Sequence, residues 1–145
     1  MEELLALDTL EKKLITMYID SPGGYMEQGF AIIDVMRGLR SKLQTIICGE
    51  ACSMATFIAL HGKIRLMTGH AHWMGHEMSR ESCDYYSKEK YRFAYEERVW
   101  LQLRQMYVEK TKLTEKDMYI IDHGELWLNA KQCLDKGIVD KVLGG

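Results

Sequence analysis

The sequence predicts an α/β fold with a mostly parallel sheet, because short buried strands alternate with helices. Two apolar runs have the length and the flanking residues of buried strands, LITMYID at residues 14–20 and LQTIICG at residues 43–49. Between them, apolar residues recur at helical spacing over residues 26–39. Strands and helices in this order form βαβ units whose strands run parallel. In such sheets, sites lie where strands end and helices begin.

The rest of the chain continues this alternation. Residues 2–7 and 53–62 have helical patterns, and Gly62 would end the second of them. Thr114 and Asp117 resemble a capping box that opens a further helix. Asn129 would cap another helix, which Gly137 ends, and the remaining short strands are expected at residues 63–69, 71–77 and 138–142.

A long helix is expected from the N-cap Ser87 to about Lys110. Its apolar residues repeat every four positions and include Tyr91, Tyr95, Val99 and Leu103. Taken alone, this helix would expose Tyr91, Tyr95, Val99 and Trp100 to water. Aromatic residues on several of its sides indicate that it packs on more than one surface, such as a neighbouring subunit.

Length and composition fit one soluble domain over residues 1–145. The chain is 47% hydrophobic and 28% charged, with a net charge of −2, so no basic surface for nucleic acid or an anionic membrane is expected. No apolar run approaches the roughly 18 residues that cross a bilayer, and no signal peptide is evident. We therefore expect a cytoplasmic protein with reduced thiols at Cys48, Cys52, Cys83 and Cys133.

The segment GEACSMA at residues 49–55 puts a cysteine and a serine side by side where a strand becomes a helix. A helix N-terminus has free N–H groups and a partial positive charge, which suit an oxyanion beside a nucleophile. Ser53 is then either a nucleophile or only the N-cap of the helix. Cys52 is the better nucleophile by its chemistry, although its small apolar neighbours favour an inert core thiol.

The SPGG segment and His76 can each be explained either by a function or by local structure alone. The glycines of SPGG at residues 21–24 let another chain approach closely, yet the same tetrapeptide is an ordinary turn signal. His76 ends an apolar stretch and suits a general base, yet a surface histidine has the same pattern. His70 and His72 would share a strand face near His76, but no carboxylate or thiolate completes a metal site at a typical spacing.

Taken in order, these segments resemble the Clp protease proteolytic subunit family, ClpP. The matching motifs are YIDSPGG, IICGEACSMA, WMGHE and LWLNAKQCLDKGIVDKV, and the resemblance covers about residues 4–142. It implies a ClpP/crotonase-like fold of repeated ββα units, with a long handle helix at about residues 87–110 that protrudes. It also implies a self-compartmentalising serine endopeptidase without metal or cofactor, which cleaves unfolded polypeptides or peptides. The implied partners are further copies in a heptameric or stacked double ring, and an AAA+ unfoldase.

The resemblance also assigns roles to individual residues. Ser53 matches the nucleophile, His76 the general base and Glu125 the acid of a catalytic triad. Gly23 and Met54 match the residues whose backbone N–H groups form the oxyanion hole. Gly24 and Tyr25 match the strip where substrate adds as a β-strand.

The chain departs from the family pattern at several points. The family's usual acid is an aspartate, so Asp122 competes with Glu125, and Glu125 is favoured because the downstream segment aligns without a gap. Glu77 adjoins His76 and would point to the opposite face of the strand. Residues 79–90, SRESCDYYSKEK, replace a glycine-rich strand that helps rings stack and binds substrate. The N-terminus has no counterpart of the loop and strand that face the unfoldase. Two explanations stay open, a divergent, phage-like member of the family or an incomplete sequence.

Two other functions remain as alternatives. One is a ClpP-like subunit without activity that has a structural or ring-modulating role. The other is a crotonase-like enzyme in which paired backbone N–H groups polarise an acyl-thioester carbonyl. Labelling of a serine by a fluorophosphonate probe separates the peptidase from both.

Overall fold

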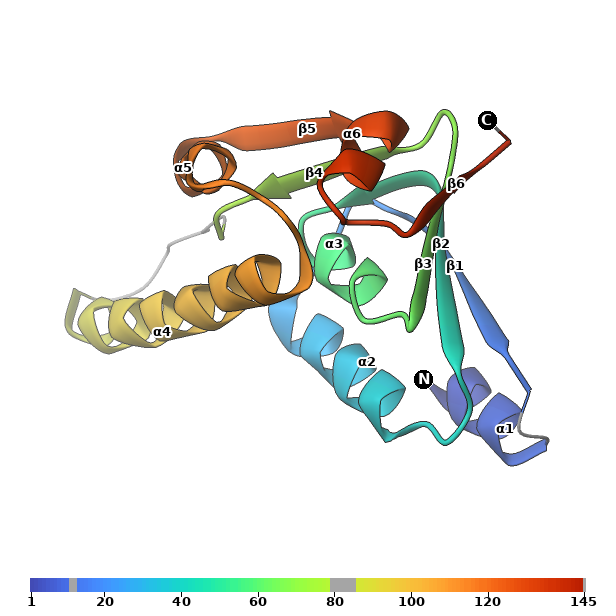
Figure 1. The fold of residues 1–145 in the computed structure, drawn as a ribbon. Helices are drawn as coiled ribbons and strands as arrows, with labels where there is room; N and C mark the ends of the chain where they lie inside the picture. The colour runs from blue at the N-terminus through green and yellow to red at the C-terminus, as the bar shows by residue number, and fades with distance from the viewer. Residues whose placement is uncertain (11–12, 79–85, 145) are drawn as a thin grey trace.

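The computed structural model describes residues 1–10, 13–78 and 86–144 and confirms the predicted α/β fold class (Figure 1). The helices are α1 (Glu2–Leu10), α2 (Met26–Gly38), α3 (Met54–Ala59), α4 (Tyr86–Lys110), α5 (Glu115–His123) and α6 (Ala130–Asp135). The strands are β1 (Ile15–Ser21), β2 (Leu43–Cys52), β3 (Ile64–Thr68), β4 (His72–His76), β5 (Glu125–Asn129) and β6 (Lys141–Leu143).

The six strands form one sheet whose centre is β2. Strand β2 pairs in parallel with β1 on one side, from Leu43 to Ala51. On its other side, residues 44–47 pair in parallel with β3 and residues 50–52 with β4. Strand β6 joins β3 in parallel, and β5 joins β4 as the antiparallel pair of the sheet. The expected, mostly parallel sheet is thus confirmed. The change of partner along β2 matters for function, because it brings the end of β4 beside the start of α3.

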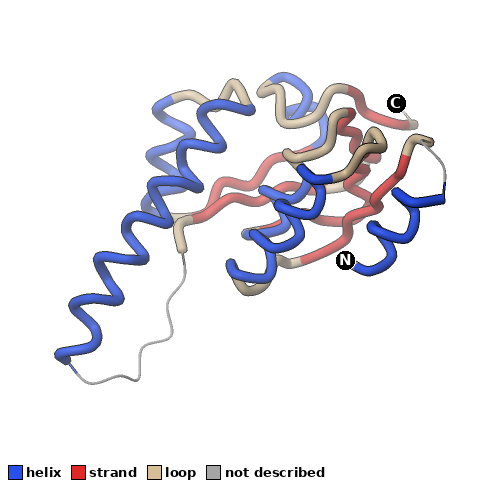
Figure 2. The backbone as a smooth tube through the Cα atoms, turned by 90° about the horizontal axis from the view of Figure 1, so that it is seen from below, coloured by secondary structure: helices blue, strands red, loops and turns tan. Residues whose placement is uncertain are grey.

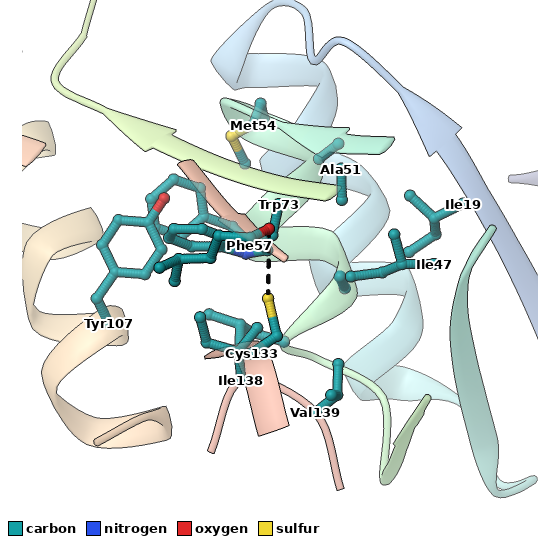
Figure 3. Packing of buried hydrophobic residues seen from close by; sticks show 14 of the residues in the cluster. Ile19, Ile47, Ala51, Met54, Phe57, Trp73, Tyr107, Cys133, Ile138 and Val139 are labelled. Atoms are coloured by element: carbon teal, nitrogen blue, oxygen red, sulfur yellow. Dashed lines mark hydrogen bonds between the residues drawn. The ribbon is translucent and has the colours of Figure 1, made fainter. Parts of the chain in front are cut away.

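Helix α3 is enclosed by the sheet, by α2 and by one end of α4 (Figures 1 and 2). Most of its residues are buried, among them Met54, Thr56 and Phe57. Figure 3 shows Phe57 beside Trp73 of β4 and Tyr107 of α4 in the main hydrophobic cluster. The first turn of α3 is therefore fixed by packing from several elements that are distant in the sequence.

Helix α4 has two different halves. Its C-terminal half packs into the core, where Val99, Leu103 and Tyr107 are buried. Its N-terminal half extends away from the sheet (Figure 1), and the side chains of Tyr91 and Tyr95 are 80% and 51% exposed. The expectation that Val99 would be exposed was wrong, because that turn of the helix faces the core.

Several element boundaries differ from the sequence-based expectation. Strand β2 continues to Cys52, and α3 ends at Ala59, so Gly62 lies in the turn before β3 and does not end the helix. Helix α4 begins at Tyr86, so Ser87 lies inside it and is not its N-cap. The last strand comes three residues later than expected, because Ile138 and Val139 pack into the core ahead of it.

The capping box expected at Thr114 is present, and the expected cap Asn129 also forms one. Thr114 and Asp117 exchange hydrogen bonds at the start of α5, and Asn129 and Gln132 do so at the start of α6. Gly137 follows α6 with a φ of +64°, as expected for a residue that ends a helix.

Candidate active site

A cavity of about 1050 Å³ opens where the turn after β1, the start of α3, the end of β4 and α4 meet. Ser53 and His76 both line it, as do Met54, Gly24 and Tyr25. These are five of the seven residues for which the sequence predicts a catalytic or binding role. The cavity lies at the carboxyl ends of parallel strands, where α/β sheets form their sites.

The backbone of Ser53 has a conformation that is unusual for a serine. Its φ is +51° and its ψ is −125°, and among the residues that the structure describes it is the one non-glycine residue with a positive φ. Such a conformation costs about 1–3 kcal/mol and persists only where the surroundings impose it. Ser53 occupies the N-cap position of α3, but its side chain makes no capping hydrogen bond. The serine thus sits on a strained strand-to-helix turn, similar to a nucleophile elbow.

Three hydrogen bonds hold this turn in place. The N–H of Ser53 donates to the carbonyl of Met74 in β4 over 2.9 Å. The carbonyl of Ser53 accepts from the N–H of Thr56 over 3.0 Å and from its hydroxyl over 2.6 Å. Both backbone polar groups of the serine are therefore satisfied while its own hydroxyl makes no cap.

The glycines of SPGG lie directly against this turn. Gly23 has a φ of +107°. A Cβ atom at Gly23 would be 2.7 Å from Cβ of Ser53 and 3.2 Å from the backbone nitrogen of Met54. This close approach requires glycine, and it brings the predicted oxyanion-hole residues, Gly23 and Met54, together at Ser53. In this structure the N–H of Gly23 donates to Oγ of Ser21 over 3.2 Å.

Strand pairing brings the predicted acid beside the predicted base. Glu125 is the first residue of β5 and is the direct antiparallel partner of His76. Directly opposed residues have their side chains on the same face, with Cβ atoms about 4.5–5.5 Å apart. Oε2 of Glu125 accepts a hydrogen bond from Nε1 of Trp127 over 2.8 Å. Within the described part of the chain, no hydrogen bond joins His76 to Ser53 or to Glu125, and catalytic hydrogen bonds are often loose without substrate.

The competing acid, Asp122, has another partner. Its Oδ2 accepts from Nε of Arg104 over 3.1 Å, which ties α5 to α4. The strand register places Glu125 opposite His76, whereas Asp122 belongs to the helix before β5. Glu77 is exposed, lines the cavity and directly follows β4.

Cys52 has the properties of an inert thiol. It is buried, and its Sγ donates to Oε2 of Glu50 over 3.6 Å. Burial, and after it the negative charges of Glu50 and Glu125, raise the pKa of Cys52 to about 11. A thiol with this pKa is protonated near neutral pH and is a poor nucleophile. Cys48, Cys52 and Cys133 are free thiols as expected, and Cys83 lies outside the described residues.

Helix α4 supplies cavity residues that the sequence did not indicate. Arg92, Glu96 and Trp100 line the same cavity as Ser53, and Nε of Arg92 donates to Oε1 of Glu96 over 2.9 Å. Their spacing of four is the available signal, but that spacing is also normal for a solvent-exposed helix face. The sequence likewise did not indicate Thr56, whose hydroxyl bonds the carbonyl of Ser53, or Tyr107, whose hydroxyl bonds that of Thr56.

Over residues 1–10, 13–78 and 86–144, no three His, Cys, Asp or Glu side chains gather in a way that could hold a metal ion. In the same part of the chain, every helix is too short or too polar to pass through a membrane.

Comparison with known proteins gives one consistent result. The model of the Clp protease family matches residues 1–145. The ATP-dependent Clp protease proteolytic subunit of Streptococcus mutans serotype c is 30% identical over 146 residues, covering 97% of this chain and 74% of that protein. The proteins of the same name from Atropa belladonna and Daucus carota are each 32% identical over 141 residues. Those alignments cover 91% of this chain and 69% and 68% of the two plant proteins.

Proposed function

Because the chain belongs to the Clp protease family, we propose that it is a serine-type endopeptidase that hydrolyses unfolded polypeptides or peptides. Ser53 is the nucleophile, His76 the general base and Glu125 the acid that orients the histidine. One observation carries the proposal: Ser53 occupies a strained strand-to-helix turn and lines the same cavity as His76. Helix capping does not explain this strained conformation, because the hydroxyl of Ser53 makes no capping hydrogen bond to α3.

The reaction follows the general serine-protease scheme. Oγ of Ser53 attacks the scissile carbonyl carbon while His76 takes the hydroxyl proton. His76 then gives this proton to the leaving amine, and the C–N bond breaks to leave an ester on Ser53. In the second half, His76 takes a proton from water while the water oxygen attacks the ester carbonyl carbon. The bond from this carbon to Oγ of Ser53 then breaks, His76 gives the proton to Oγ, and the acid product leaves.

Backbone N–H groups of Met54 and Gly23 stabilise the tetrahedral oxyanion. Met54 is the first residue of α3, so its N–H is one of the donors that an α-helix leaves without an internal partner. The N–H of Gly23 donates to Ser21 in this structure, and it turns to the oxyanion when substrate binds. Substrate extends along Gly24 and Tyr25, which line the cavity, and pairs through its backbone.

The enzyme acts as a homo-oligomeric ring, heptameric or stacked in pairs, with an AAA+ unfoldase as the partner that supplies unfolded chains. The N-terminal half of α4 supports assembly, because Tyr91, Phe93 and Tyr95 are 80%, 59% and 51% exposed there. Burial of a large apolar side chain contributes roughly 1.5–3 kcal/mol, so a second surface over this helix would be favourable. A closed chamber would restrict substrates to chains that can be threaded into it.

The test is active-site labelling with a fluorophosphonate probe, combined with a measurement of particle mass. The wild type should be labelled at Ser53 and should hydrolyse a fluorogenic peptide. Ser53→Ala should lose both properties and keep the wild-type mass, whereas Cys52→Ala should keep both. Activity that survives Ser53→Ala and disappears in Cys52→Ala would reassign the nucleophile. A wild-type ring that neither reacts with the probe nor hydrolyses peptides would be the inactive, structural subunit.

A further inference from the structure

We propose that Thr56 and Tyr107 are positioning residues for the reaction, which hold the peptide unit between Ser53 and Met54 in its reactive orientation. This inference rests on the proposed function and identifies two residues that the family motifs do not include. It starts from a chain of two short hydrogen bonds behind Ser53. Oγ1 of Thr56 is 2.6 Å from the carbonyl oxygen of Ser53 and 2.6 Å from the hydroxyl of Tyr107.

The direction of both hydrogen bonds follows from counting protons. The hydroxyl of Thr56 has one proton, and the carbonyl of Ser53 can only accept. Thr56 therefore donates to Ser53, and Tyr107 donates to Thr56. Tyr107 is fully buried, and this burial raises the pKa of its phenol far above the usual value, so the hydroxyl keeps the proton that it donates.

The peptide unit that accepts this hydrogen bond is the one that matters for catalysis. The carbonyl of Ser53 and the N–H of Met54 belong to the same planar, trans peptide group, so they point in opposite directions. The hydrogen bonds that fix the carbonyl thus also fix the direction of the Met54 N–H, which is a donor to the oxyanion in the proposed mechanism. Because Ser53 has a positive φ, this peptide group would relax if it were not held.

Tyr107 also contacts the strand that ends in His76. A Cβ atom at Gly75 would be 3.3 Å from the hydroxyl oxygen of Tyr107, and Gly75 directly precedes His76. The ring of Tyr107 is itself held on two sides, stacked on Phe57 at 4.3 Å and edge-on to Trp73 at 5.6 Å (Figure 3). One side chain of α4 thus lies against both segments that carry the proposed nucleophile and base.

The chain contains a matched control for a purely structural hydroxyl. Thr45 is buried, and its Oγ1 donates to the carbonyl of Ala59 at the other end of α3 over 2.8 Å. Both threonines are thus buried and donate to a backbone carbonyl of α3 or its cap. Thr45 donates to Ala59, the last residue of α3, and Thr56 donates to Ser53, its N-cap residue. Of these two side-chain hydrogen bonds, only the one from Thr56 is made to the peptide group beside the proposed nucleophile.

The experiment compares Thr56→Val, Thr56→Ser, Tyr107→Phe and the control Thr45→Val in the full-length, assembled protein. The readouts are the rate constant for fluorophosphonate labelling of Ser53, kcat and KM for a fluorogenic peptide, and the midpoint of thermal unfolding. Thr56→Val should lower the labelling rate and kcat about 10-fold with little change in KM, a loss of about 1.4 kcal/mol that is within the usual range for one hydrogen bond. Thr56→Ser keeps the donor and should restore both values to within about 2-fold.

Tyr107→Phe keeps the aromatic packing and the bond from Thr56 to Ser53, so it remains informative if Thr56→Val does not fold. It should lower kcat by about 3-fold to 10-fold. The double variant Thr56→Val with Tyr107→Phe should lower kcat by less than the product of the two single effects, because both changes act on one chain of hydrogen bonds. Thr45→Val should lose thermal stability to a similar extent but keep the wild-type labelling rate.

Equal labelling rates for Thr56→Val, Tyr107→Phe and Thr45→Val would overturn the positioning role while leaving the proposed function intact. If the wild type itself is not labelled at Ser53, the proposed function fails, and the positioning role fails with it.

Discussion

The replacement of Glu125 by glutamine is the most informative single change at the proposed site. It removes one negative charge but keeps an oxygen that can accept the hydrogen bond from Nε1 of Trp127, which is 2.8 Å long in the wild type. The packing of β5 should therefore survive. The change tests whether a carboxylate at this position orients and stabilises His76, its direct partner in the strand pair.

The expected size of the effect follows from the position of the carboxylate. Two unit charges about 4 Å apart interact by about 1 kcal/mol in bulk water and about 4 kcal/mol at an effective dielectric constant near 20. Each 1.36 kcal/mol changes a rate about tenfold, so this range corresponds to a loss of about 5-fold to 1000-fold. Glu125 is exposed to solvent. We therefore expect Glu125→Gln to lower kcat/KM about 100-fold, less than the roughly 10⁴-fold loss for the buried aspartate of the serine-protease template.

The assay is hydrolysis of a fluorogenic peptide at saturating and sub-saturating concentration, with Asp122→Asn as the comparison. Asp122 is bound by Arg104 over 3.1 Å, so its replacement should lower stability by about 1 kcal/mol and leave kcat/KM within about 2-fold of wild type. Wild-type activity in Glu125→Gln together with an inactive Asp122→Asn would refute the assignment. If neither change affects an active enzyme, the histidine is oriented by other groups and the triad is wrong.

Three further predictions concern other parts of the molecule. Gly23→Ala should reduce probe labelling at least about 100-fold, because its Cβ would lie 2.7 Å from that of Ser53 at a φ of +107°, whereas Gly38→Ala, with open space around it, should label normally. Normal labelling of Gly23→Ala would show that this glycine is not close to the reacting atoms in solution. Contacts with Ser41, and then with the backbone N–H of Arg40, lower the pKa of Asp8 from 3.8 to about 2. This lowered pKa contributes stability that is fully present above the unfolded-state pKa and is lost as the pH falls through about 2. The variant Asp8→Asn should therefore be less stable than the wild type near neutral pH. Its free energy of unfolding in urea should also lack the acid-dependent loss that the wild type shows. A wild-type pH dependence in Asp8→Asn would contradict this origin. Tyr91→Glu together with Tyr95→Glu should reduce the particle mass in sedimentation, since both side chains are more than half exposed on α4, while Tyr119→Glu on α5 should leave it unchanged. An unchanged mass in the double variant would exclude this half of α4 from the interface.

Local patterns were sufficient to predict the fold class and most elements. The alternation of apolar runs with helical spacing indicated the parallel sheet, and the side chains at Thr114 and Asn129 identified two helix starts, because a capping box is formed by residues only three apart. Strand β5 was not predicted. Its buried residues, Leu126 and Leu128, alternate over only five positions, and the strand exists because β4 offers it an edge.

By itself the sequence determined the chemistry that is available, since a serine on a strand-to-helix junction, a histidine at a strand end and a glycine pair can be recognised from residue type and order. The tertiary structure decided which of the competing residues lie together. It set Glu125 opposite His76, joined Asp122 to Arg104 and buried Cys52 beside Glu50, where the thiol stays protonated. It also brought Tyr107 to Thr56, 51 positions earlier in the chain. Such contacts depend on strand register and helix packing over the whole chain, and no local pattern of residues specifies them.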